Sequence, residues 1–232
     1  MSGDGAEFDA LADSYEAELR RAVSLSGETP DFYARERVAF LATCLRALGH
    51  RPHAVLDYGC GLGNASIHLS RLLGPALLVG VDESRESVKR AATSFGATAQ
   101  FVPLRELAPE PRFDLVYCSG VLHHIQPEDR AAAFAYLDER LKPGALLALW
   151  ENNPWNPVVT LTMNRSVIDR NAVKVPPPEL QRLVRSAGFE LLRTDFLFYF
   201  PRFLSPLRVL EPWLRKIPLG AQYQVLCRKP RA

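Results

Sequence analysis

The stretch VLDYGCGLGN, residues 55–64, decides the fold. An apolar run reaches an aspartate, Asp57, and then continues into three glycines at alternate positions, Gly59, Gly61 and Gly63. One glycine is enough for an ordinary turn, because a residue without a Cβ atom tolerates a positive φ. Three glycines this close together favour a backbone that curls tightly and lies against a bound molecule.

Short apolar runs and longer helical segments alternate around this stretch. The alternation is typical of βα units, in which helices cover both faces of a mainly parallel sheet. The runs predict strands at Ala54–Tyr58, Ala76–Val81, Thr98–Val102, Phe113–Cys118 and Ala145–Trp150.

The two ends of the chain complete one large domain. Apolar spacing predicts N-terminal helices over Asp9–Ala22 and Phe32–Gly49. A turn is expected at Lys142–Gly144, before the fifth strand. The last third predicts one helix and then two strands, which we expect to form a closing hairpin: Pro178–Ala187, Phe189–Phe200 and Gln222–Cys227.

Composition narrows the class of protein. The chain has 232 residues, of which 47% are hydrophobic and 23% are charged, so it can bury a full core as one domain. The formal charge of +2 is too small to indicate a nucleic-acid partner. The first twenty residues lack an apolar secretion signal, and no apolar run approaches the roughly 18 residues of a membrane span. The four cysteines form no CxxC pair, so we expect a cytoplasmic protein without disulfides or a metal site.

The residues around the glycines indicate which ligand binds there. In an open α/β sheet, ligands bind at the carboxyl ends of the strands, where the strand order reverses. The dinucleotide fingerprint has its third glycine three residues after the second, a position that Asn64 occupies here. Asp57 would repel a pyrophosphate but would attract an ammonium group. S-adenosylmethionine (SAM) carries an α-amino group and a sulfonium, so it fits better than NAD, whose oxidoreductases are the alternative class.

A second acidic site follows the next strand. In GVDES, residues 80–84, Asp82 lies about twenty residues beyond the glycines, where a carboxylate can accept hydrogen bonds from two ribose hydroxyls. The alternative is that Asp82 only caps the following helix, a role that Ser84 can also fill. Its neighbour Glu83 belongs to the same candidate site.

With these motifs in order, the chain resembles the class I SAM-dependent methyltransferases, in particular the small-molecule group that includes the ubiquinone and menaquinone biosynthesis enzymes. The resemblance runs from about residue 15 to residue 144. It rests on VLDYGCGLGN, GVDES, FDLVYCSGVLHHI (113–125) and LKPGALLAL (141–149). It implies a Rossmann-like α/β fold with a seven-stranded mixed sheet, helices on both faces and an antiparallel last strand.

The resemblance also implies how SAM is held. Residues 1–50 would form helices that cover the cofactor, and residues 51–232 would form the core. One departure concerns the end of the third strand, where relatives often use an aspartate for the adenine amino group. Here residues 101–104 read FVPL, so backbone groups and apolar packing would hold the adenine. The cofactor-binding candidates are Tyr15, Tyr33, Arg37, Asp57, Gly59, Cys60, Gly61, Gly63, Asp82, Glu83 and Cys118, of which the first three would meet the methionine carboxylate.

The chemistry itself asks mainly for alignment, because the sulfonium cofactor already carries an activated methyl group. His123 and His124 leave the fourth strand towards the methyl group and are candidates for a general base. Packing or shaping of the cofactor site is the alternative, because relatives with different acceptors carry histidines here. Glu151 is the other catalytic candidate, with hydrogen bonding to the following Asn-rich loop as its alternative role. Cys118 has no basic partner in the sequence and is expected to be a small core residue rather than a nucleophile.

The acceptor is the least defined part of the prediction. We expect methyl transfer to an oxygen, nitrogen or carbon of a small molecule such as a sugar, phenol, polyketide or lipid-linked compound. The loop ENNPWNP, residues 151–157, offers amides and the ring of Trp155 for such a molecule. Residues 202–219 mix aromatic and cationic side chains, which fits contact with a membrane surface, a lipid-linked substrate or a second copy of the chain. A protein that binds SAM without turnover is also consistent with these residues.

Overall fold

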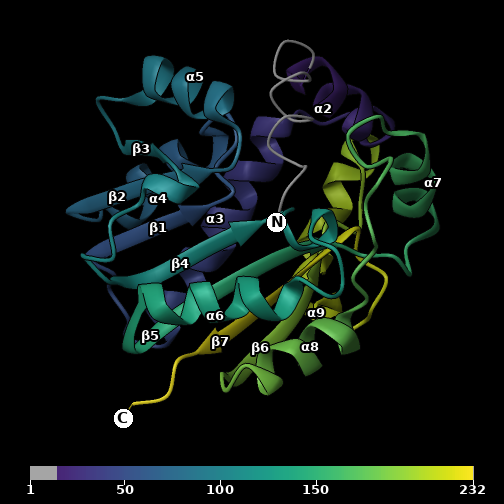
Figure 1. Cartoon of the computed structure of the whole chain (residues 1–232). Coiled ribbons are helices and arrows are strands. Elements are labelled where there is room, and N and C mark those ends of the chain that lie inside the picture. Colours follow the sequence, from purple (N-terminus) through teal and green to yellow (C-terminus); the bar gives the residue numbers. More distant parts are fainter. Residues whose placement is uncertain (1–14, 232) are drawn as a thin grey trace.

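A twisted sheet runs through the molecule (Figure 1). The computed structural model describes residues 15–231, with the side chains of residues 15 and 16 excepted. The strands are β1 (Ala54–Tyr58), β2 (Leu77–Asp82), β3 (Gln100–Pro103), β4 (Phe113–Ser119), β5 (Leu141–Asn152), β6 (Glu190–Leu197) and β7 (Gln222–Arg228). They form one seven-stranded sheet in the order β3-β2-β1-β4-β5-β7-β6.

The pairing directions agree with the fold that the motifs imply. Strands β3, β2, β1, β4 and β5 pair in parallel, whereas β7 is antiparallel to both β5 and β6. The predicted Rossmann-like α/β sheet with an antiparallel last strand is therefore confirmed. The strand order reverses between β1 and β4, so their carboxyl ends form the point where such sheets bind ligands.

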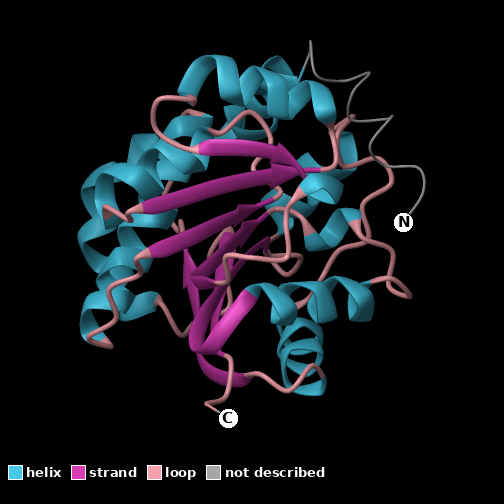
Figure 2. Ribbon diagram, turned by 60° about the vertical axis from the view of Figure 1, so that its left-hand side comes forward, coloured by secondary structure: helices cyan, strands magenta, loops and turns pink. Residues whose placement is uncertain are grey.

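Helices cover both sides of the sheet (Figure 2). Figure 1 shows α2 and α7 beyond the arrowheads of the parallel strands, above the end where ligands are expected. The α-helices are α2 (Tyr15–Val23), α3 (Pro30–Ala47), α4 (Asn64–Leu73), α5 (Arg85–Phe95), α6 (Arg130–Arg140), α7 (Pro157–Arg165), α8 (Pro177–Ser186) and α9 (Glu211–Leu214). The 3₁₀ segments are η1 (Ser24–Ser26), η2 (Leu104–Glu106), η3 (Leu122–His124) and η4 (Arg202–Leu210).

The core has two halves, one on each face of the sheet. Along β5, Leu147 and Leu149 belong to the cluster that includes residues of α6 and α8, whereas Ala148 and Trp150 belong to the cluster with α3 and α4. Alternate side chains of a strand point to opposite faces, so a strand buried on both faces reads as a continuous apolar run. This explains why the runs were visible in the sequence.

Helix starts follow local hydrogen-bonding rules. Thr29 caps α3, Ser84 caps α5 and Asn156 caps α7, in each case by accepting a backbone N–H of the first turn. Two of these helices, α3 and α7, also begin with proline, whose fixed φ suits the first helical position. The cap of α5 is therefore Ser84 and not Asp82.

Two predicted strand boundaries differ from the structure by three residues or more, and one predicted helix falls partly outside the described residues. The fifth strand begins at Leu141 and not at Ala145, because Leu141 pairs with Phe113 and the N–H of Gly144 donates to the Lys229 carbonyl. The sixth strand ends at Leu197, because the left-handed φ of 64° at Phe198 turns the chain away. The first predicted helix is seen from residue 15 onward.

The proposed division at residue 50 stays a prediction. Helix α3 contributes Val38, Leu41 and Leu45 to the core cluster on its face of the sheet. Helix α2 lies at the carboxyl ends of the strands and contacts α7. Of the N-terminal helices, α2 therefore has the position of a cover, and α3 belongs to the packed core.

Candidate active site

A cavity of about 600 Å³ lies at the carboxyl ends of the parallel strands, within the rough 300–1,000 Å³ range of small-molecule sites. Residues 59–63, here called the glycine loop, line one part of its wall through residues 59–62. Other parts come from helices α2, α3 and α7, the segment η3 and the stretches 166–169 and 198–203, together with the carboxyl ends of β1, β4 and β5, the start of α4 and the start of β7. The cavity thus lies where the strand order reverses.

The glycine loop leaves β1 as a tight turn fastened to β2. The N–H groups of Gly59 and Cys60 both donate to the Val81 carbonyl, at 2.8 and 2.9 Å. Gly59 and Gly61 have φ values of 74° and 51°. A Cβ atom on Gly59 would lie 2.2 Å from Val121 Cγ2, so glycine is required there by packing as well as by conformation.

Asp82 holds this loop from the end of β2. One carboxylate oxygen accepts the N–H of Gly61 at 2.8 Å, and the other accepts the N–H of Ser84 at 2.9 Å. The helix-cap role belongs to Ser84, whose Oγ accepts the N–H of Ser87 at 3.1 Å. A carboxylate has about four acceptor positions, so ribose contacts by Asp82 stay compatible with both bonds and stay a prediction.

Asp57 is a buried carboxylate in the cavity wall. Its Oδ2 accepts a hydrogen bond from Ser66 Oγ at 2.6 Å. Burial raises the pKa of Asp57 to about 7. The negative charge of Asp82 also raises it, whereas the hydrogen bond from Ser66 lowers it. A cationic ligand beside this carboxylate favours its charged form.

Helix α3 places Tyr33 and Arg37 one turn apart, and both line the cavity. Arg37 Nη1 donates to Gln222 Oε1 at 3.2 Å, whereas its Nε is buried without a hydrogen-bond partner among the described residues. A guanidinium in the cavity wall fits a carboxylate ligand. Tyr33 packs on Phe198 at 4.8 Å between ring centroids, and the side chain of Tyr15 lies outside the described residues.

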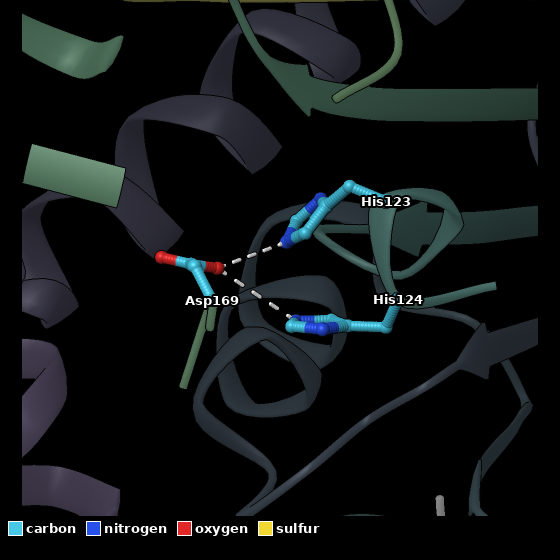
Figure 3. A group of neighbouring side chains, drawn as sticks. All are labelled: His123, His124 and Asp169. Carbon is cyan, nitrogen blue, oxygen red and sulfur yellow. Dashed lines mark ion pairs between the residues drawn. The ribbon is translucent and has the colours of Figure 1, made fainter. Parts of the chain in front are cut away.

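Two histidines, two carboxylates and a loop meet on the other side of the cavity. His123 Nδ1 lies 2.5 Å from Glu151 Oε2, and the N–H of Leu122 donates to Glu151 Oε1 at 2.9 Å. Figure 3 shows both histidines directed at Asp169, whose Oδ1 is 3.3 Å from His123 Nε2 and 3.9 Å from His124 Nε2. Glu151 therefore bonds to η3 and not, as its alternative role predicted, to the Asn-rich loop.

Burial and neighbouring charges act differently on the two histidines. Burial lowers the pKa of His123, but the charges of Glu151 and Asp169 outweigh burial and raise it to about 10. Burial, with the charge of His123, lowers the pKa of His124 to about 3. Because carboxylates face both of its ring nitrogens, His123 fits a positioning role better than that of a general base. A base role for either histidine stays a prediction.

The structure separates the predicted site residues into two groups. Tyr33, Arg37, Asp57, Gly59, Cys60, Gly61, His123 and His124 line the cavity. The other described candidates are not part of that wall: Gly63, Asp82, Glu83, Cys118 and Glu151. Cys118 lies in the core with a thiol whose pKa burial raises, which confirms the expectation of a core residue and leaves its assignment to the cofactor site unsupported.

Asp169 and Ser66 were missed by sequence reasoning. Asp169 lies in a loop after α7, in the sequence SVIDRNAV, which matches no motif. The loop is held by the N–H of Val173, which donates to the His123 carbonyl at 2.7 Å. Ser66 lies on α4, nine residues beyond Asp57. Its place in the first helical turn after the glycine loop was the one feature of the sequence that could have indicated a contact with Asp57.

Two amides of the Asn-rich loop, those of Asn153 and Asn156, have partners within the fold, while Asn152 and Asn156 also line the cavity, so the loop's role in acceptor binding stays a prediction. The Asn153 side chain donates to the carbonyls of Pro218 and Gly220, at 3.0 and 2.8 Å. The Asn156 amide donates to the Leu219 carbonyl at 2.8 Å, and its oxygen caps α7. The loop therefore fastens residues 218–220 to the end of β5.

Residues 202–219 present apolar groups to solvent, and several of their cations are engaged within the fold. Phe203 is 78% exposed and Trp213 is 75% exposed. Arg208 pairs with a glutamate at 2.8 Å, Lys216 pairs with Asp195 at 2.9 Å, and Arg215 stacks over a phenylalanine ring. No helix in the part of the chain that the structure describes is long and apolar enough to cross a membrane.

Comparisons with known proteins agree with this geometry. A family model described as "Methyltransferase domain" matches residues 55–144. An uncharacterized methyltransferase of Synechocystis sp. PCC 6803 is 30% identical over 60% of this chain and 68% of its own length. The alpha N-terminal protein methyltransferase 1 of Drosophila melanogaster is 28% identical over 72% of this chain, and the match spans 60% of the fly protein.

A solved structure shares the fold over nearly the whole chain. Magnesium protoporphyrin IX methyltransferase from Synechocystis PCC 6803, crystallised with bound SAH, gives a TM-score of 0.64 at 19% identity. The comparison covers 98% of this chain and 100% of that one.

Proposed function

Since the chain belongs to the class I SAM-dependent methyltransferases, we propose that it transfers a methyl group from SAM to a small-molecule acceptor. SAM is the cofactor of this family, and membership in it counts against the alternative of an NAD-linked oxidoreductase. The observation that carries the proposal is one cavity wall that combines the glycine loop, a buried carboxylate at Asp57 and the guanidinium of Arg37.

These residues fit the methionine end of SAM, which carries both charges. Asp57 would accept the ammonium group, and Arg37 would donate to the carboxylate. The glycine loop would let the backbone approach the ligand, and Asp82 would hold the loop and meet the ribose. When SAM is bound, an acceptor nucleophile can attack its sulfonium methyl carbon; the C–S bond breaks with its electron pair passing to sulfur, and the acceptor loses a proton.

The outer part of the cavity supports an acceptor with an apolar portion. Its wall there includes Leu25, Val158, Phe200 and Phe203, whereas the inner wall carries the two histidines and Asp169. An acceptor with one polar end and an apolar body matches this division, which favours a phenol, polyketide or lipid-linked compound over a free sugar. Helices α2 and α7 meet beyond the strand ends, and such a covered cavity favours a small molecule over a protein terminus.

We propose further that residues 202–219 meet the apolar part of a lipid-linked acceptor at the membrane that carries it. Phe203 supports this, because it is exposed to solvent and also lines the cavity. Because several cations are engaged within the fold, we expect apolar contact to contribute more to membrane binding than attraction to anionic lipid does.

A turnover screen tests the proposed function. Purified chain and SAM are incubated with phenols, polyketide-like aromatics, prenol-linked compounds, sugars and amines, and release of S-adenosylhomocysteine is measured by mass spectrometry. The proposal expects release with an amphiphilic acceptor, and less release from the Asp57→Asn variant at a SAM concentration that does not saturate the wild type. SAM binding without release from any acceptor class would support the alternative of a SAM-binding protein without turnover.

A further inference from the structure

We propose that His123, His124 and Asp169 form a binding site for a divalent transition-metal ion, and that Glu151 positions His123 for it. The three residues each offer one ligand atom, and these atoms all lie within 4.8 Å of one another. Figure 3 shows the three side chains converging from η3 and from the loop after α7. Binding of the metal ion does not depend on the proposed function. The role that we give the ion in catalysis does rest on that function.

The donor set selects the class of metal. Two imidazole nitrogens and one carboxylate oxygen suit Zn²⁺, Fe²⁺, Mn²⁺ or Co²⁺, whereas Mg²⁺ and Ca²⁺ prefer oxygen donors alone. Metal–ligand bonds of about 2.0–2.2 Å place neighbouring donors about 3–3.5 Å apart. The 3.3 Å separation of His123 Nε2 and Asp169 Oδ1 has this spacing, whereas His124 Nε2, at 3.9 Å from the same oxygen, would have to move closer when an ion binds.

Glu151 supplies the support that histidine ligands commonly have. Its Oε2 lies 2.5 Å from His123 Nδ1 and accepts a hydrogen bond from that nitrogen, which leaves Nε2 directed at the cluster. Glu151 is itself fixed by the N–H of Leu122 and is almost fully buried. A carboxylate behind a ligating histidine orients the ring and strengthens it as a ligand.

The site would face the acceptor. His123, His124 and Asp169 all belong to the cavity wall. Three protein ligands leave at least one coordination position of such an ion open, as in catalytic metal sites. An acceptor hydroxyl bound there would lose its proton more readily, because the cation stabilises the resulting oxygen anion. This role would replace the general base that the sequence assigned to the histidines.

A pair elsewhere in the chain serves as the matched control. His68 Nε2 lies 2.7 Å from Asp31 Oδ1, so it is also a histidine beside a carboxylate. It belongs to no group of three ligand atoms in the searched, described part of the chain. The His68→Gln variant therefore removes a histidine–carboxylate contact without touching the proposed site.

The test is direct metal binding. Chain freed of metal by a chelator is titrated with Co²⁺, followed by visible absorption, and with Zn²⁺, followed by calorimetry. We expect one ion per chain. Asp169→Asn and His124→Gln should each weaken binding at least tenfold, Glu151→Gln should weaken it about 10–100-fold, and His68→Gln should leave it unchanged. Circular dichroism of each variant checks the fold. Because His124 is partly exposed, His124→Gln is expected to fold and so keeps the test decisive if another variant does not fold.

Two results would overturn the site. If the wild-type chain binds neither ion, the cluster is a network of protonated histidine and carboxylates that holds the loop after α7. Equal binding by wild type and Asp169→Asn would place the ion elsewhere. A parallel SAM titration separates this inference from the proposed function, since SAM binding without metal binding removes only the site, and metal binding without SAM binding removes only the function.

Discussion

The backbone N–H of Gly61 donates a 2.8 Å hydrogen bond to the Asp82 carboxylate, which joins the loop after β1 to the end of β2. The Val81 carbonyl accepts two further N–H groups from the same loop. The shape of the glycine loop therefore depends on the neighbouring strand as well as on its own glycines. A change at Asp82 should affect the ligand in two ways, through the loop and through the ribose.

Asp82→Ala should weaken SAM binding about 30- to 100-fold, the equivalent of about 2–3 kcal/mol for lost charge-assisted hydrogen bonds. Calorimetry of wild type and variant with S-adenosylhomocysteine and with its 2′-deoxy analogue separates the ribose contact from the effect on the loop, by the logic of a double-mutant cycle. If Asp82 meets the ribose, the variant should lose discrimination between the two ligands. Full discrimination by the variant would limit Asp82 to the loop.

Asp57→Asn should stabilise the ligand-free protein while weakening SAM binding at least tenfold. The folded-state pKa of Asp57, about 7, lies above the ordinary value of 3.8. The carboxyl group therefore favours the folded state fully only below pH 3.8, and that contribution is lost as the pH rises through about 7. Thermal unfolding should show a higher midpoint for the variant at pH 8, and a smaller difference at pH 4. A lower midpoint at pH 8 would contradict the burial argument.

SAM affinity of the wild type should fall as the pH drops below about 7. An ammonium ligand needs the charged form of Asp57, which becomes scarcer below its pKa, by about tenfold per pH unit. Calorimetry between pH 5.5 and 8 measures the slope. The Asp57→Asn variant is the control and should show a flatter profile; equal profiles would separate Asp57 from the ligand.

Arg37→Gln should weaken SAM binding at least tenfold by removing a charge-assisted contact with the ligand carboxylate. Decarboxylated SAM lacks that group, so wild type and variant should bind it alike. Arg46→Gln, on the exposed side of the same helix, is the matched control. Equal losses for both ligands would show that Arg37 acts through Gln222 and the packing of α3.

Replacing Phe203 and Trp213 together by serine should reduce sedimentation of the chain with phospholipid vesicles and leave its unfolding midpoint unchanged, because both rings are exposed. The effect should change little between 0.1 and 0.5 M salt, roughly the range over which exposed charges become screened. Wild-type chain that stays in the supernatant would contradict membrane contact by residues 202–219.

The sequence specified most of what depends on local pattern. Strand β1 was predicted to the residue, because burial on both faces makes it a continuous apolar run ending in glycines. Asp57 was found because it interrupts that run. Asp169 could not be found, because it meets His123 only after α6, β5 and α7 have folded and brought the following loop back to η3. The expectation of no metal site rested on the absence of CxxC spacing, and such spacing says nothing of a group whose members, His124 and Asp169, are 45 residues apart.

The central claim is that the glycine loop forms the SAM site, and a SAM titration of Gly61→Val by calorimetry tests it most directly. Gly61 lines the cavity with a φ of 51°. Gly74 is the matched control, since its φ is 59° and a Cβ atom there would meet nothing within 4 Å. We predict one SAM per wild-type chain, unchanged affinity in Gly74→Val, and at least a roughly hundredfold loss, about 2.7 kcal/mol, in a folded Gly61→Val variant. Wild-type affinity in Gly61→Val would contradict the claim.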